Sequence, residues 1–284
     1  MKYAFLSALA VLGTATAVPA AAQDTDPPKP ITVTGSVALV TDYRLRGVSQ
    51  TDKEGAIQGG FTIAHESGVY ISTWASNLAG WGTFGGSNME LDLIGGFKMP
   101  IGGGAAVDVG LTWYMYPGGA SKTDFAEPYV KVSGTLGPAS LLAGVAYAPK
   151  QEALGKWYDD AAAYGGEGGP QHPGAKNDNL YLWLDGSSAL PGTPITLKGH
   201  VGHSNGNDGL GPNGTSAAPT GEYWDWMLGA DLAIPHTPLT LSAQWIDTDI
   251  SNRESAYLKP NFSSTKNGSS IAGSTAVFSL TAAF

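Results

Sequence analysis

Charged side chains recur at intervals of two residues within otherwise apolar stretches of this sequence. Asp42, Arg44 and Arg46 have this spacing, and on a β-strand they would share one face at steps of about 7 Å. A row of fixed charges of both signs along a water-filled passage can select among ions and polar solutes. By the same alternation we predict eight further lumen-lining residues, namely Glu90, Asp92, Lys98, Asp108, Lys198, His200, Asp225 and Asp231. If the strands enclose no passage, each of them is an ordinary solvated surface residue.

The chain offers little for catalysis or metal binding. It has no Cys, which excludes a thiol nucleophile, a Cys-ligated zinc and a disulfide framework. His200 and His203 would lie on opposite faces of one strand, so we do not expect them to share a metal ion. His203 and Ser204 are opposed in the same way, which argues against a hydroxyl nucleophile with its base. We therefore predict no catalytic residue, no metal, no cofactor and no enzymatic activity.

Alternation of apolar and polar residues dominates the chain from Ile31 onward, and helical spacing is nearly absent. Most of the alternating segments have about 10 to 12 residues, the length that a tilted strand needs to cross a bilayer and more than most soluble strands have. We predict twelve strands, with approximate bounds 33–44, 56–66, 69–78, 88–99, 105–116, 124–134, 139–148, 179–188, 193–204, 222–233, 239–248 and 272–284.

The connections between these segments alternate between short and long. Five short connections contain Gly or Pro, as tight turns require, and six longer ones are mostly polar. Bacterial outer-membrane barrels have short periplasmic turns, longer external loops and an even number of strands. The sequence therefore predicts an all-β protein that forms a single antiparallel transmembrane β-barrel of about 12 strands. A soluble antiparallel sandwich shows the same alternation and is the alternative.

Aromatic residues and the end of the chain support the barrel. Many strands have an aromatic residue toward the long-loop end, where a membrane-interface girdle is expected, although Trp113 and Tyr116 have opposite parity and need not both face lipid. The last segment ends on Phe284, which resembles the terminal signal that outer-membrane proteins present to their insertion machinery. We expect the lipid bilayer and this machinery as partners. The girdle candidates are Trp113, Tyr116, Phe125, Tyr147, Tyr181, Trp183, Trp224, Trp226 and Trp245.

The N-terminal segment has the composition of an export signal. Lys2 precedes an uncharged run with an apolar middle, which ends in the small-residue cleavage pattern Ala20-Ala21-Ala22-Gln23. A permanent transmembrane helix is the alternative, but Gly13 and Pro19 weaken a helix there. We predict a signal peptide at residues 1–22, a short periplasmic leader at 23–32 and a barrel in the bacterial outer membrane at 33–284.

Composition narrows the function further. Charged residues make up 14% of the chain, against about 25% in ordinary soluble domains, and the net charge is −9. This acidic balance leaves no broad basic face for phosphates, so nucleic-acid binding is not expected. Twelve strands lie between the roughly eight that side chains fill and the roughly 16 to 18 that leave a wide pore, so we predict a narrow passage. The long loop from Pro149 to Asp178 is able to fold inward and block it.

One stretch is similar to a known family. Residues Thr41 to Asp52 read Thr-Asp-Tyr-Arg-Leu-Arg-Gly-Val-Ser-Gln-Thr-Asp and resemble the opening strand of proteobacterial outer-membrane porins of the TorF type. Members of that family begin with a similar Asp-Tyr-Arg-x-Arg-Gly-x-Ser-Gln stretch. The segments at residues 56–61, 73–77 and 90–92 look like its continuation. The resemblance implies an outer-membrane barrel of porin type and names no solute.

Three functions are compatible with these patterns. We expect first a porin, a passive narrow channel for small polar solutes or ions whose lumen charges set its selectivity. A closed barrel that serves structure or adhesion is the alternative, and the absence of current steps in planar bilayers would favour it. A barrel-embedded hydrolase is less favoured, and it would lose turnover with Ser204→Ala or His203→Ala.

Overall fold

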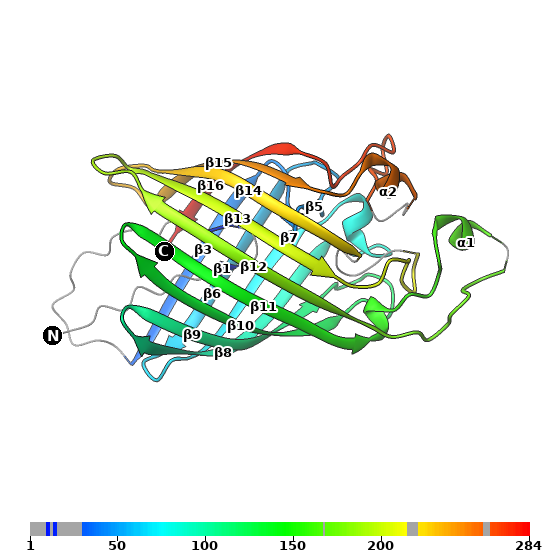
Figure 1. Cartoon of the computed structure of the whole chain (residues 1–284), viewed down its shortest axis with the longest axis horizontal. Coiled ribbons are helices and arrows are strands. Elements are labelled where there is room, and N and C mark those ends of the chain that lie inside the picture. Colours follow the sequence, from blue (N-terminus) through cyan, green and yellow to red (C-terminus); the bar gives the residue numbers. More distant parts are fainter. Residues whose placement is uncertain (1–9, 12–13, 16–29, 167, 215–220, 258–261) are drawn as a thin grey trace.

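Twelve long antiparallel strands close into one barrel (Figure 1). This computed structural model describes residues 10–11, 14–15, 30–166, 168–214, 221–257 and 262–284. Each barrel strand pairs with its neighbours along the chain, and the sheet closes where the last strand pairs with the first. The barrel strands are β3 (Ile31–Val40), β6 (Ala56–His65), β7 (Val69–Asn77), β8 (Met89–Gly102), β9 (Ala105–Met115), β10 (Phe125–Leu136), β11 (Ala139–Gln151), β12 (Asn177–Ala189), β13 (Ile195–Asn205), β14 (Glu222–Ala233), β15 (Leu239–Thr248) and β16 (Thr275–Ala283).

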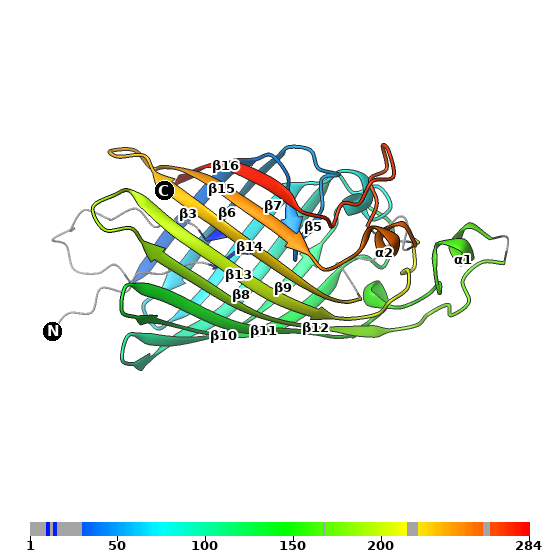
Figure 2. The same cartoon turned by 45° about the horizontal axis from the view of Figure 1, so that its top comes forward.

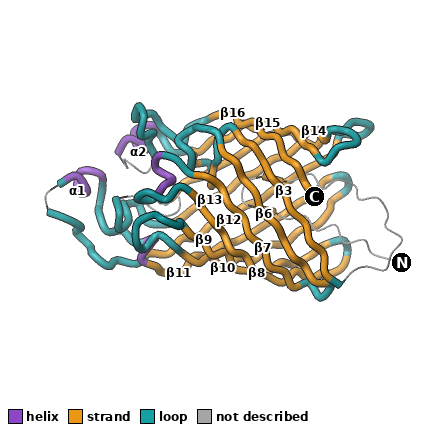
Figure 3. The backbone as a smooth tube through the Cα atoms, turned by 180° about the vertical axis from the view of Figure 1, so that it is seen from behind, coloured by secondary structure: helices purple, strands orange, loops and turns teal. Residues whose placement is uncertain are grey.

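Short elements lie outside the barrel wall. The helices η1 (Gly80–Thr83), η2 (Glu152–Leu154), α1 (Ala161–Gly165) and α2 (Asn252–Tyr257) belong to the long loops. Figures 2 and 3 show these loops gathered at the end of the barrel opposite the C-terminus. No helix among the described residues is long and apolar enough to cross a bilayer.

Two further strand pairs are separate from the barrel sheet. The strands β4 (Arg44–Leu45) and β5 (Val48–Ser49) pair with each other, and so do β1 (Ala10–Val11) and β2 (Thr14–Ala15). Apart from β1 and β2, the predicted signal peptide lies outside the described residues, as does the leader up to residue 29. Both assignments stay predictions.

Apolar side chains cover the outside of the barrel. Ile57 and Leu228 are 63% and 68% exposed, and the other outward positions of the strands are similarly apolar. One sheet closes on itself and no second sheet covers it among the described residues, so the predicted single barrel is confirmed and the sandwich is wrong. A closed ladder leaves no strand edge unpaired, which is the condition for strands to cross a bilayer.

The predicted aromatic girdle is only partly on the outside. Trp113, Tyr147, Trp224 and Trp245 are about half exposed on the outer face, and the alternation of β14 places Trp226 there too. The other four candidates point inward: Tyr116, Phe125 and Tyr181 are buried, and the Trp183 ring stacks on the Tyr181 ring. Strand parity separates the two groups, because the inward residues lie on the face opposite the exposed apolar side chains.

The last residue takes part in closing the barrel. The backbone N–H groups of Gly35 and Phe284 each donate to the other residue's carbonyl oxygen, at 2.8 and 2.9 Å. A Cβ atom at position 35 would lie 2.7 Å from the Phe284 ring, so glycine leaves the room that this ring occupies. The Phe284 side chain is itself largely exposed. Its recognition by insertion machinery stays a prediction.

The outward position of Leu228 can be tested by its cost in lipid. Leu228 lies midway along β14, whereas Leu136 ends β10 beside a short turn. We expect Leu228→Arg to lower the free energy of unfolding by about 2–4 kcal/mol and Leu136→Arg by about 0–1 kcal/mol, because the penalty for Arg is largest at the bilayer midplane. Denaturant titration of the protein folded in phospholipid vesicles measures both values. Equal costs at the two positions would contradict a lipid-facing midpoint at Leu228.

Candidate functional site

The loop that follows β3 folds into the barrel. Residues 42–52, which include β4 and β5 and are called the inserted hairpin below, are all buried. Tyr43 contacts Trp74 on β7 and Glu90 on β8, whereas Arg46 contacts Glu127 on β10 and Tyr181 on β12. Because β7 and β8 lie several strands away from β12 around the ring, the inserted hairpin bridges the interior from wall to wall.

This placement corrects the first predicted strand. The strand predicted at residues 33–44 ends at Val40, so Asp42, Arg44 and Arg46 do not lie on the barrel wall at successive two-residue steps. Their spacing of two persists, but Arg46 has φ +50° and Gly47 has φ +78°, which turn the chain back on itself. The three residues are inside the barrel as parts of the inserted hairpin.

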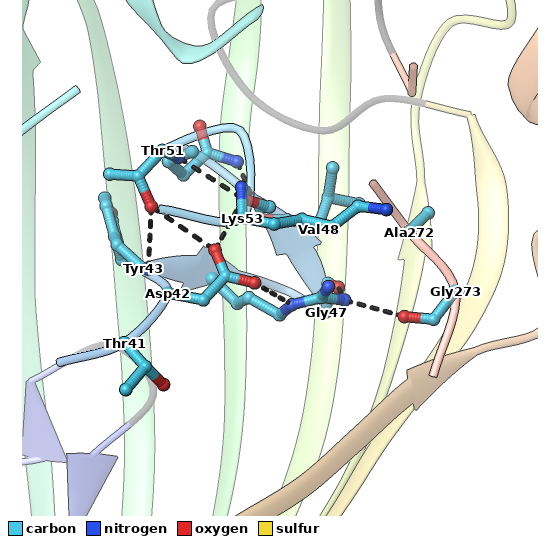
Figure 4. A network of polar contacts seen from close by, with 12 residues as sticks. Thr41, Asp42, Tyr43, Gly47, Val48, Thr51, Lys53, Ala272 and Gly273 are labelled. Carbon is cyan, nitrogen blue, oxygen red and sulfur yellow. Dashed lines mark hydrogen bonds and ion pairs between the residues drawn. The ribbon is translucent and has the colours of Figure 1, made fainter. Parts of the chain in front are cut away.

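Polar contacts within the inserted hairpin explain why it leaves the sheet (Figure 4). The Asp42 carboxylate accepts from Arg44 Nε at 2.8 Å and from Ser49 Oγ at 2.5 Å, while Tyr43 N donates to Thr51 Oγ1 at 3.0 Å. At the tip, a Cβ on Gly47 would lie 2.4 Å from Thr248 Cγ2, so only glycine lets the turn approach β15 this closely. The backbone groups that leave the ladder of β3 find partners within the hairpin, in the Tyr43 N to Thr51 Oγ1 bond, in the Gln50 N to Tyr43 O bond and in the β4–β5 pair.

An ion pair attaches the hairpin to β10. Arg46 Nη2 donates to both oxygens of Glu127, at 2.7 and 2.8 Å, and both side chains are nearly fully buried. The guanidinium lies 4.2 Å from the centre of the Tyr181 ring, in a cation–π contact. Burial alone would lower the pKa of Arg46, but the Glu127 carboxylate outweighs it and the pKa rises, so this residue is always charged. The hydroxyl of Tyr223 donates to the Arg46 carbonyl at 3.1 Å.

Tyr43 attaches the hairpin to β7 and β8. Its ring lies edge-on to Trp74, with 5.1 Å between ring centres, and its hydroxyl donates to Glu90 Oε2 at 3.1 Å. Burial, and after it the charges of Glu90 and Asp92, raise the pKa of Tyr43 well above its ordinary value. The phenol therefore stays protonated and acts as a donor.

A second loop covers the inserted hairpin. Ile271 O accepts from Ser49 N at 3.0 Å. Gly273 O accepts from Arg44 Nη1 at 2.9 Å (Figure 4). The aromatic ring of Phe262, from the same loop, packs against Trp81 of η1 and against Tyr223. The hairpin is therefore closed off from the long-loop end of the barrel.

The other eight predicted lumen residues lie on the inner face of the strands. Lys198 forms an ion pair with Asp231 at 2.7 Å, and both side chains are 3% exposed. His200 Nδ1 lies 2.6 Å from Asp185, and its Nε2 lies 3.1 Å from Asp225. Their inward orientation follows from the exposed apolar residues between them; a role in solute selection stays a prediction.

The remaining predicted residues of this group are on β8 and β9. Asp108 accepts from the Tyr70 hydroxyl at 2.8 Å, and Lys98 is half-buried on the same face. Glu90 and Asp92 are fully buried beside the inserted hairpin. Sequence reasoning missed Glu127, Lys131 and Asp185, although the same parity argument applied to β10 and β12 would have found them.

The longest loop does not block the barrel. Trp157 and Tyr158 form backbone hydrogen bonds with Leu210, and Lys156 pairs with Asp208 at 2.7 Å, so this loop packs on the neighbouring external loop. Asp208 raises the pKa of Lys156, chiefly through their hydrogen bond. In Figure 1 the loop carries α1 away from the barrel. The segment that fills the interior is the first loop.

The residues considered for hydrolysis do not meet. Ser204 is fully buried on the inner face, whereas the His203 ring faces outward and packs on Trp224 with 4.6 Å between ring centres. Among the described residues, no group of three or more His, Asp or Glu side chains is arranged to hold a metal ion.

The Arg46–Glu127 pair yields a stability prediction. We expect Arg46→Met to lower the free energy of unfolding by about 3–5 kcal/mol, because it leaves the Glu127 carboxylate buried without its partner. Lys266→Met is the control, since its pair with Glu54 is exposed and surface pairs contribute about 0–1 kcal/mol. Denaturant titration gives both values, and hydrogen exchange of residues 42–52 should rise only in Arg46→Met. Unchanged exchange there would show that Arg46 does not hold the hairpin.

Comparisons with known proteins agree with this fold. The chain is 8% identical to the NanC porin, with 89% of this chain and 99% of that one covered and a TM-score of 0.51. A KdgM porin in complex with oligogalacturonate is 6% identical, with 89% and 99% covered and a TM-score of 0.49. An outer-membrane channel from Pseudomonas putida F1 is 10% identical, with 92% and 99% covered and a TM-score of 0.43. The likeness to NanC shows a shared porin-type barrel.

The sequence itself matches a family that is defined without a function. No protein of curated function matches it. The profile of Gcw_chp, described as a bacterial protein of unknown function, matches residues 24–284. That range includes the whole barrel and the inserted hairpin, so the chain belongs to this family.

Proposed function

We propose that this protein is a narrow outer-membrane channel for small polar solutes or ions, and that the inserted hairpin holds it closed. The observation that carries the proposal is the barrel itself, which is apolar outside and charged inside. Charged side chains on an inner face can line a path for polar solutes and set its selectivity. The resemblance of residues 41–52 to TorF-type porins points the same way.

The inner face favours cations. Among the described residues, its buried and half-buried charged side chains are seven carboxylates, three lysines and His200. The fixed charge of the lumen is therefore negative, and a negative lumen attracts cations and repels anions. The carboxylates are Glu90, Asp92, Asp108, Glu127, Asp185, Asp225 and Asp231, and the lysines are Lys98, Lys131 and Lys198.

A permanently closed barrel is the second candidate, because the inserted hairpin is buried and bonded to several strands. Two observations favour a hairpin that moves. All eight buried side-chain atoms that lack a hydrogen-bond partner among the described residues belong to the hairpin or to β8 and β12, which it contacts. In addition, Arg46 and Asp52 have φ values of +50° and +57°, which cost energy for residues other than glycine. Unpaired polar atoms and strained backbone thus make the packing of the hairpin less stable than that of an ordinary protein core.

Shortening the hairpin tests the channel. We expect the wild-type protein to show small or rare current steps in planar bilayers, because the hairpin closes the lumen. A variant in which residues 42–52 are replaced by a short Gly-Ser linker should show steps several-fold larger. The control is a variant with the same linker in place of residues 161–169, in the long external loop, whose current should equal that of wild type. If the correctly folded shortened variant gives no current steps in planar bilayers, the closed structural barrel is favoured.

Selectivity is measured on the same shortened variant. Under a KCl gradient, its reversal potential should have the sign of a cation-selective pore, because the deletion removes two arginines and two aspartates, a net charge of zero, and leaves the wall carboxylates. Asp231→Asn with Lys198→Met removes one charge of each sign and should leave the reversal potential nearly unchanged. Anion selectivity would contradict the proposed role of the wall charges.

A further inference from the structure

Two carboxylates beside the inserted hairpin lack a compensating positive charge. Glu90 and Asp92 are two residues apart on β8 and fully buried on its inner face. Tyr43 donates to one Glu90 oxygen, but the other Glu90 oxygen and both Asp92 oxygens have no hydrogen-bond partner among the described residues. Buried carboxylates without partners are costly while they are ionised, so they either take up a proton or bind a cation.

The surrounding charges do not balance the pair. Asp92 lies near Glu90 and Glu127, and the three carboxylates repel one another when they are ionised. Arg46 is engaged by Glu127 at 2.7 Å. Three carboxylates thus have one guanidinium among them, and in the ionised state two negative charges are left over. Charge alone therefore points to a positive ligand at this place.

The donor atoms indicate which kind of cation fits. Two carboxylates and a phenol hydroxyl offer only oxygen, which suits Ca²⁺ and Mg²⁺ and disfavours metals that require nitrogen or sulfur ligands. Ca²⁺ accepts irregular sets of about 6 to 8 oxygens, including water, whereas Mg²⁺ demands a near-ideal octahedron. A site with two carboxylates needs several water ligands, because among the described residues no group of three or more acidic or His side chains surrounds one point.

We propose that Glu90 and Asp92 bind a hard divalent cation, best matched by Ca²⁺, beside Tyr43 of the inserted hairpin. The cation neutralises the pair, and the water that completes its coordination enters with it, because both carboxylates are fully buried without it. It also stabilises the part of the hairpin around Tyr43, so that charge holds the hairpin both there and at the Arg46–Glu127 ion pair. This last consequence rests on the proposed function, whereas the binding itself does not.

Calorimetric titration tests the site. The protein is folded in detergent, treated with EDTA, dialysed and titrated with CaCl₂, with MgCl₂ and NaCl in parallel. We expect one saturable Ca²⁺ site, and a rise in the thermal unfolding midpoint on adding Ca²⁺. The variants Glu90→Gln and Asp92→Asn keep side-chain size and should each bind Ca²⁺ at least about tenfold more weakly, a loss of about 1.4 kcal/mol or more. Asp208→Asn, which removes an exposed carboxylate in an external loop, should bind as wild type does.

Each outcome decides the matter. The site is overturned if wild type binds no Ca²⁺ or if the two amide variants bind as tightly as wild type. It is also overturned if the thermal unfolding midpoint of wild type does not change with Ca²⁺ but rises on acidification. In that case protons, and not a cation, neutralise Glu90 and Asp92. If the protein binds Ca²⁺ through Glu90 and Asp92 but gives no current after hairpin shortening, the cation site stands and the channel proposal fails.

Discussion

In a bilayer every backbone N–H and C=O group must find its partner within the protein, and this single constraint organises the whole chain. The ladder meets it by running unbroken from β3 around to β16 and back. Once the ladder is closed, successive side chains of each strand must point alternately to the outside and to the inside of the barrel. The apolar set meets lipid, as Ile57 and Leu228 do, and the polar set, with Lys198 and Asp231, is confined to the interior.

Confinement of polar groups creates a second problem, which the inserted hairpin solves. The interior of a twelve-stranded barrel is wider than wall side chains can fill, so buried charges there need partners from elsewhere. Glu127 obtains one from Arg46, and the loop carbonyl of Gly273 satisfies Arg44. The hairpin therefore fills the interior of the barrel and supplies Arg46 as the counter-charge of Glu127. A plug of this kind is weaker than an apolar core, because a buried ion pair adds little net stability once desolvation is counted.

The strands could be predicted from the sequence because their signal is local. Alternation, strand length, and Gly and Pro at the short turns can each be read from a short stretch of sequence. Together they predicted the bounds of the twelve strands to within a few residues. The end of the first strand could not be predicted in this way, since Asp42, Arg44 and Arg46 continue the alternation after the sheet has ended. Their partners Glu127 and Gly273 lie 81 and 229 residues away along the chain. One local signal was present: Tyr43, Leu45 and Val48 give this loop an apolar content that an external loop does not need.

The contrast between wall and hairpin also explains where the sequence is most specific. Many residue types are compatible with an outward position of β14 or β15, because a lipid-facing position requires only an apolar side chain. The hairpin has narrower requirements: Asp42 must accept from Ser49 and Arg44, and position 47 admits no Cβ beside Thr248. Arg46 must reach Glu127 from a left-handed backbone conformation. Residues 41–52, from which the sequence predicts a TorF-type resemblance, form this same segment, so the motif describes the hairpin inside the barrel and not the wall. The family that the sequence matches is Gcw_chp, over residues 24–284.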